Sequence, residues 1–168
     1  MRLSDIDMMT SKCFKITGKM IYWYAVVALM LPNMALVMTE GMPIMACLTN
    51  VILPLAVYMT AMSLTARPGK MVWWLFILIF FAAFQLVLLY LFDQGVMAVD
   101  MFLNLVTTNP GEAMELLGNL FPAVMGVFVI YLPLLVLSIV SINRSSGTLA
   151  PASRMVYRKI ALTAGAVG

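Results

Sequence analysis

The sequence contains no histidine and only two cysteines, Cys13 and Cys47. Cys13 belongs to the amino-terminal tail and Cys47 to an apolar segment, so we expect the two thiols to lie too far apart for a disulfide or a thiolate metal site. The sequence also lacks a glycine-rich phosphate-binding loop and a nucleophile motif. We therefore predict no catalytic residue, no metal site and no cofactor within this chain.

Charged residues are scarce as well. They make up 10% of the 168 residues, and apolar residues make up 64%, whereas soluble domains have about 25% and roughly 45–50%. The apolar residues fall in blocks of about 20, which is the helix length needed to cross a hydrocarbon core of ~30 Å. An apolar segment in lipid satisfies its peptide groups by bonding within itself. The composition therefore predicts an all-α, polytopic membrane helix bundle.

Four of the apolar blocks are long enough to span a bilayer. The first exceeds the apolar run of a secretory signal peptide, so we interpret it as an uncleaved signal anchor. A fifth, shorter block follows Arg158 and Lys159, and we interpret it as the start of a fifth span; a short interfacial tail helix is the alternative. The predicted full spans are residues 20–38, 43–64, 71–92 and 120–142, and the partial span is 156–168.

The basic residues all lie on one side of this predicted topology. The ten Lys and Arg residues precede the first span, lie between the second and third, or follow the fourth, and such segments face the cytoplasm. The other two connections contain Glu40 and, within 93–118, four more acidic residues. We predict a bacterial inner-membrane protein with a cytoplasmic amino terminus and a periplasmic segment 93–118. We therefore interpret the net charge of +3 as a signal for orientation in the membrane, and we predict no nucleic-acid partner.

Polar side chains within the predicted spans are few. The main ones are Asn33, Asn50 and Gln85. These amides are expected to bond between helices, or to backbone groups freed by Pro32 and Pro54. No ionisable residue is central to any of the four full spans. This absence argues against a proton- or ion-coupled transporter, which needs such groups along its pathway.

The long outward connection, 93–118, is predicted to contain short interfacial helices. Apolar residues recur at helical spacing from Val99 to Val106, so one helix is expected along the membrane surface. A second is expected from Pro110, with Asn109 as its cap and Glu112 at its third position, where the carboxylate can bond back to the cap amide. The predicted fold is thus four full spans plus the start of a fifth, with these helices between spans three and four.

The same connection resembles the periplasmic segment in the membrane domain of phosphoethanolamine transferases. This family of lipid A modifying enzymes includes the mobile colistin-resistance proteins. The shared pattern is an Asn, a Thr four residues later and a Glu four further, matched here by Asn104, Thr108 and Glu112, and followed by Ala113 and a pair of leucines. The predicted order of spans is also similar, with a long outward segment between the third and fourth and a fifth helix leading to the periplasm.

The resemblance implies a function for the chain. In that family a periplasmic, alkaline-phosphatase-like domain follows the fifth helix, and its zinc-activated threonine moves phosphoethanolamine from phosphatidylethanolamine to lipid A. That catalytic domain, with its zinc, is missing here, so these residues alone are expected to be inactive. By resemblance, Asn104, Thr108 and Glu112 bind the lipid head group, with Glu112 against the ethanolamine ammonium. The implied partners are both lipids and the chain's own carboxyl-terminal catalytic domain.

Two alternatives stay open. Glu112 also fits a purely structural role in the helix cap, and the ring of Pro110 opposes helix continuity with Val106, so spacing alone does not place the three side chains on one face. For the protein as a whole, the alternative is a small self-contained integral membrane protein, such as an assembly factor or a transporter subunit.

Overall fold

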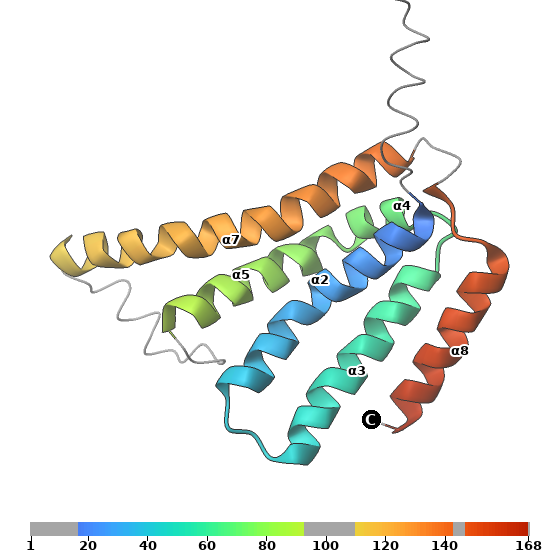
Figure 1. Ribbon diagram of the computed structural model, residues 1–168, viewed down its shortest axis with the longest axis horizontal. Coiled ribbons are helices and arrows are strands. Elements are labelled where there is room, and N and C mark those ends of the chain that lie inside the picture. The colour runs from blue at the N-terminus through green and yellow to red at the C-terminus, as the bar shows by residue number, and fades with distance from the viewer. Residues whose placement is uncertain (1–16, 93–109, 143–146, 168) are drawn as a thin grey trace, which may run out of the picture.

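The computed structural model describes residues 17–92, 110–142 and 147–167. Within these ranges the chain is helical and contains no strand. Two groups of helices diverge from one end of the molecule, α5 with α7 and α2 with α3 and α8 (Figure 1). The helices are α2 (Gly18–Thr39), α3 (Ile44–Ser63), α4 (Pro68–Trp74), α5 (Phe76–Phe92), α7 (Pro110–Ile142) and α8 (Pro151–Val167).

Three helices are long and apolar enough to cross a membrane by themselves. They are α2, α3 and the Leu120–Ile142 part of α7. Helices α4 and α5 qualify only as a pair, with a bend of 68° between them. The predicted all-helical architecture is confirmed, with three candidate membrane spans in the described residues, or four if the bent pair counts as one.

The third predicted span differs from the structure. It was expected to run without interruption over 71–92, but residues 71–74 belong to α4, and the next helix, α5, starts at Phe76. The reason lies in packing, because Gly69 of α4 fits tightly against α7. A Cβ atom on Gly69 would contact the Oγ of Ser141 and lie 2.7 Å from the carbonyl oxygen of Ser138. This contact directs α4 away from the α5 axis.

Helix α7 is longer than expected. It contains 33 residues and extends about 50 Å at 1.5 Å per residue. The sequence predicted a separate interfacial helix from Pro110 and a fourth span from residue 120, but the structure joins the two into one helix. Residues 112–117 are strong helix formers, and an isolated glycine such as Gly118 is tolerated within a helix.

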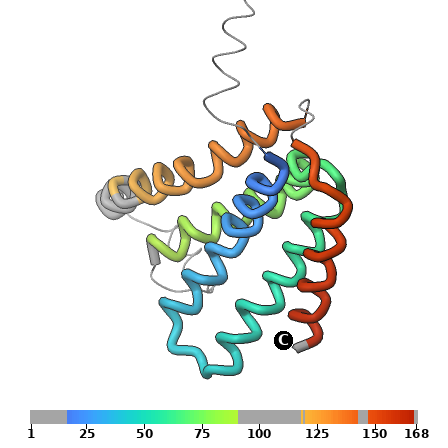
Figure 2. Tube along the Cα trace, turned by 45° about the vertical axis from the view of Figure 1, so that its right-hand side comes forward, coloured from blue at the N-terminus to red at the C-terminus, as the bar shows by residue number. Residues whose placement is uncertain are grey.

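Helix α8 runs alongside α3 in the opposite direction (Figures 1 and 2). It starts at Pro151, five residues before the predicted partial span. Near its other end, a Cβ atom on Gly165 would lie 3.3 Å from the Cβ of Ala56. Helix α8 has 17 residues and is not among the helices that qualify as membrane spans on their own. The structure therefore shows α8 packed beside α3 but does not establish a fifth span.

The helix ends at one side of the bundle are joined by hydrogen bonds to backbone carbonyls; we call this side the basic end. The Leu149 amide donates a hydrogen bond to the Ala66 carbonyl at 2.7 Å, and Arg67 Nη1 donates one to the Ile142 carbonyl at 3.1 Å. The connection between α2 and α3, which contains Glu40, lies at the opposite side (Figure 1). The basic side chains that the structure describes lie at or near the basic end, and they are Lys19, Arg67, Lys70, Arg154, Arg158 and Lys159.

Two arginines of α8 satisfy carbonyl groups at the end of α3. A helix carboxyl terminus leaves carbonyls without a partner and carries partial negative charge. Arg154 donates from Nε to the Ser63 carbonyl at 3.1 Å and from Nη2 to the Leu64 carbonyl at 2.8 Å. Arg158, one turn further along α8, donates from Nη2 to the Ser63 carbonyl at 3.1 Å. Charge-assisted hydrogen bonds thus attach α8 to α3.

The double variant Arg154→Gln with Arg158→Gln is expected to destabilise the protein by roughly 2 kcal/mol. A hydrogen bond from a charged donor contributes ~1.5–3 kcal/mol, and partial exposure to solvent lowers the contribution of this pair. Denaturant unfolding in detergent micelles measures the change. Lys159→Gln is the matched control, since it removes a neighbouring exposed cation. Equal stability of the double variant and this control would contradict the assigned role of the arginines.

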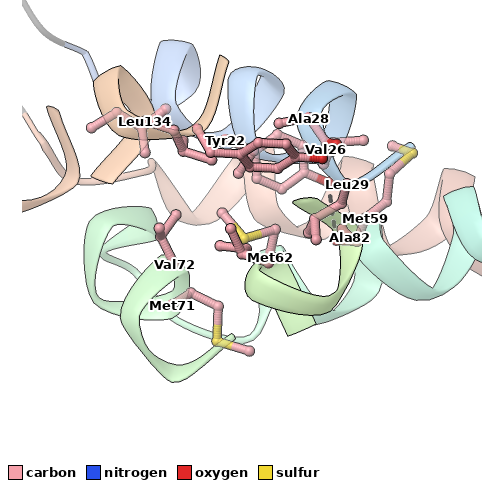
Figure 3. Packing of buried hydrophobic residues seen from close by; sticks show 14 of the residues in the cluster. Tyr22, Val26, Ala28, Leu29, Met59, Met62, Met71, Val72, Ala82 and Leu134 are labelled. Atoms are coloured by element: carbon pink, nitrogen blue, oxygen red, sulfur yellow. Dashed lines mark hydrogen bonds between the residues drawn. The ribbon is translucent and has the colours of Figure 1, made fainter. Parts of the chain in front are cut away.

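Three tyrosine hydroxyls link the helices within the core. Tyr22 donates to the Met59 carbonyl at 3.0 Å, Tyr24 to that of Ile130 at 2.6 Å and Tyr131 to that of Ala28 at 2.8 Å. Figure 3 shows Tyr22 and Ala28 within the buried cluster, together with side chains of α3, α4, α5 and α7. Bonds of this kind between membrane helices contribute about 1 kcal/mol each.

The bond from Tyr131 has a specific origin in the sequence. Pro32 has no amide hydrogen, so it cannot donate to the carbonyl of Ala28 four residues earlier in α2. The Tyr131 hydroxyl supplies a donor to that carbonyl. The predicted bonding of amides between helices is confirmed for Asn50, whose Nδ2 donates to the backbone carbonyl of Asn33 at 3.3 Å.

Candidate functional site

The predicted lipid-binding residues lie at the margin of the described structure. Asn104 and Thr108 are outside the described residues. Glu112 is the third residue of α7. The structure therefore places one of the three positions on a defined helix, and the juxtaposition of all three stays a prediction.

The position of Glu112 along α7 is defined relative to the basic end. Ile142, at the other end of α7, accepts the hydrogen bond from Arg67. At 1.5 Å per residue, Glu112 lies about 45 Å from Ile142 along the helix axis. Membrane helices tilt by up to ~40°, which still leaves a rise of about 34 Å, more than the ~30 Å hydrocarbon core. The stretch of α7 from Glu112 to Ile142 is therefore longer than the hydrocarbon core is thick.

Below that position, an apolar groove runs between α5 and α7. It has a volume of about 350 Å³ and is lined on the α5 side by Phe76, Phe80 and Phe84 and on the α7 side by residues from Val124 to Leu135. The α5 part of the lining, from Phe76 to Val87, corresponds to about 16 Å of helix. That length is close to the depth of one bilayer leaflet, half of ~30 Å.

The chemistry of the groove is that of a hydrocarbon surface. Tyr131 contributes its ring to the lining, but its hydroxyl is engaged by the Ala28 carbonyl. The groove can accommodate an apolar chain, and its lining offers no carboxylate or cation for a charged head group. Across the part of the chain that the structure describes, no cluster of three or more His, Cys, Asp or Glu side chains could hold a metal ion.

The groove was not identified from the sequence. Its aromatic row, Phe76, Phe80 and Phe84, repeats every four residues and is visible in the printed sequence. The same pattern is expected on any helix face that contacts lipid. The partner face on α7 lies about 45 residues further along the chain, and only the tertiary structure brings the two together.

Comparisons with known proteins identify no relative. No protein-family model, no curated protein and no solved structure matches this chain. The likeness to phosphoethanolamine transferases is therefore carried by the residues of the connection between spans three and four and by the predicted order of the spans.

Proposed function

We propose that this chain is the membrane domain of a phosphoethanolamine transferase, which anchors the enzyme in the bacterial inner membrane and binds its lipid substrate. The pattern of Asn104, Thr108 and Glu112 supports the family, and the length of α7 supports the role of Glu112. This helix extends from the basic end to Glu112 over more than the thickness of the hydrocarbon core. A carboxylate at that height can meet a lipid head group.

The proposed orientation places the basic end in the cytoplasm, following the preference of Lys and Arg for cytoplasmic segments. The first turns of α7 then lie in the periplasm. Helix α8 starts at the basic end and follows α3 toward that same side (Figure 2). We interpret α8 as the start of a fifth span that leads to a periplasmic catalytic domain.

Within this arrangement, the chain's contribution is to hold the donor lipid. The carboxylate of Glu112 binds the ethanolamine ammonium of phosphatidylethanolamine, and Asn104 and Thr108 contribute neutral oxygen atoms, an environment suited to an ammonium at the interface. The catalytic domain supplies the threonine nucleophile and its zinc. Transfer to lipid A then takes place above α7, and these 168 residues alone transfer nothing.

In the complete enzyme, Glu112→Gln is expected to lower transfer at least about tenfold, because loss of a charge-assisted contact costs ~1.5–3 kcal/mol and 1.4 kcal/mol is a factor of ten. Glutamine retains the ability to complete a helix cap, so membrane insertion and thermal stability should not change. Mass spectrometry of lipid A from cells with matched protein levels measures the transfer.

The matched control is Glu115→Gln, which removes a carboxylate one turn along the same helix. It is expected to leave transfer unchanged. If Glu112→Gln shows normal transfer at a normal protein level, the role of Glu112 is structural, in the helix cap, and it does not bind the lipid head group. Phosphoethanolamine on lipid A in cells that express residues 1–168 alone would contradict the assignment of catalysis to a separate domain.

A further inference from the structure

Helix α4 has two chemically different faces. Pro68, Gly69, Met71 and Val72 are buried against the bundle. Lys70, Trp73 and Trp74 are exposed, and residues spaced by three and four lie on the same side of a helix. The side chain of Trp74 is 84% exposed, so it faces the surroundings of the bundle.

The direction of α4 does not suit a membrane span. The bend of 68° between α4 and α5 occurs at a single residue, Leu75. Membrane helices tilt by about 20° on average. A bend of this size is therefore compatible with a helix that lies in the membrane plane beside the start of α5.

The depth of α4 is fixed by its neighbours. Its buried face contacts the last turn of α7, where a Cβ atom on Gly69 would lie 2.7 Å from the Ser138 carbonyl. The adjacent Arg67 bonds to the Ile142 carbonyl at the end of the same helix. Helix α4 thus lies level with the end of a candidate span, where hydrocarbon gives way to head groups.

The charge around α4 is of one sign. Among the residues that the structure describes, the basic end carries Lys and Arg side chains but no Asp or Glu. Cations at this level attract the phosphates of membrane lipids. Tryptophan prefers the same zone, because its ring is apolar and its N–H can form a hydrogen bond.

We propose that α4 is an interfacial anchor, lying in the membrane plane among phospholipid head groups, with the indoles of Trp73 and Trp74 in the head-group layer and the Lys70 ammonium against lipid phosphate. The bent pair is then one interfacial helix followed by one span, and the third span begins at Phe76. This assignment concerns the membrane-facing surface alone and does not depend on the transferase function.

Tryptophan quenching tests the assignment. A variant with Trp23→Phe and Trp73→Phe keeps Trp74 as its single tryptophan. This variant is placed in phosphatidylcholine vesicles whose acyl chains carry bromine either near the head group or near the chain end. The expected result is a larger loss of Trp74 fluorescence with bromine near the head group. In the matched control, all three tryptophans are changed to phenylalanine and Phe84 is changed to tryptophan. This fluorophore reports a position about 12 Å along α5 from its first residue, Phe76.

The control is expected to show the opposite order, with the larger loss from bromine near the chain end. A Trp74 profile equal to that of the control would overturn the proposal and make α4 the first part of a span. No loss from either bromine position would also overturn it, since protein would then cover Trp74 in place of lipid. Far-ultraviolet circular dichroism verifies that both proteins retain their helix content.

Discussion

Gly18→Ala is expected to destabilise the protein by about 3 kcal/mol, at the upper end of the range for overpacking, although it adds a single methyl group. A Cβ atom on Gly18 would lie 2.6 Å from the Thr148 carbonyl oxygen and 2.9 Å from that of Gly147. Both are backbone atoms, and the hydrogen bond of the next amide, Leu149, to Ala66 holds this segment in place. Relief therefore requires movement of the chain that leads into α8.

The matched control for this variant is Gly126→Ala. Gly126 lies within α7, and apart from the nearby backbone of its own helix no described atom lies within 4 Å of its potential Cβ position. Alanine there should be neutral or stabilise the helix by up to about 1 kcal/mol. Denaturant unfolding of both variants in the same detergent measures the difference. Equal free energies of unfolding would show that the close contact of Gly18 with the Thr148 backbone has no energetic weight.

Tyr131→Phe is expected to cost about 2 kcal/mol, because it leaves a buried carbonyl acceptor without its donor. The ring of Tyr131, which is 4% exposed, keeps its packing in the variant, so the loss reports the hydroxyl. Unfolding in detergent measures it.

A double-mutant cycle with Pro32→Ala assigns the loss to one carbonyl. Alanine at position 32 restores an amide hydrogen that can donate to the Ala28 carbonyl within α2. The cost of Tyr131→Phe should then be smaller in the Pro32→Ala background than in the native protein. An identical cost in both backgrounds would mean that the Tyr131 hydroxyl does not compensate for the proline.

The first two spans were predictable from the sequence to within two residues at each end. Their expected ranges, 20–38 and 43–64, compare with Gly18–Thr39 and Ile44–Ser63. The connection between them contains Glu40, Gly41 and Pro43, which interrupt an apolar helix, so local chemistry fixes these boundaries. Apolar block length, the signal that predicted them, is the strongest constraint on a chain in lipid.

The bend at Leu75 was not predictable in the same way. Residues 71–92 are apolar except for Gln85 and contain no proline or glycine, so the local pattern indicates a single helix. The bend accompanies the contact of Gly69 with the end of α7, about 70 residues away in the chain. A contact between segments so distant leaves no mark in the local pattern.

The candidate site was predictable in part. The sequence identified Glu112 as a residue near the start of a helix, and the continuity of α7 added its distance from the basic end. For the core, the prolines indicated freed carbonyls, but the expected donors were amides. The donor to the Ala28 carbonyl is the Tyr131 hydroxyl from a helix 103 residues away, a pairing that depends on the tertiary fold.

The uninterrupted length of α7 has a consequence for the dependence of the protein on its membrane. Because one helix connects the basic end to Glu112, the proposed orientation makes the height of residue 112 relative to the far leaflet depend on bilayer thickness. A bilayer thicker by about 5 Å submerges one more helical turn. In the proposed orientation, thickness would thus bring Glu112 to the level of the head groups or carry it past them, so we expect access to this residue to depend on acyl-chain length.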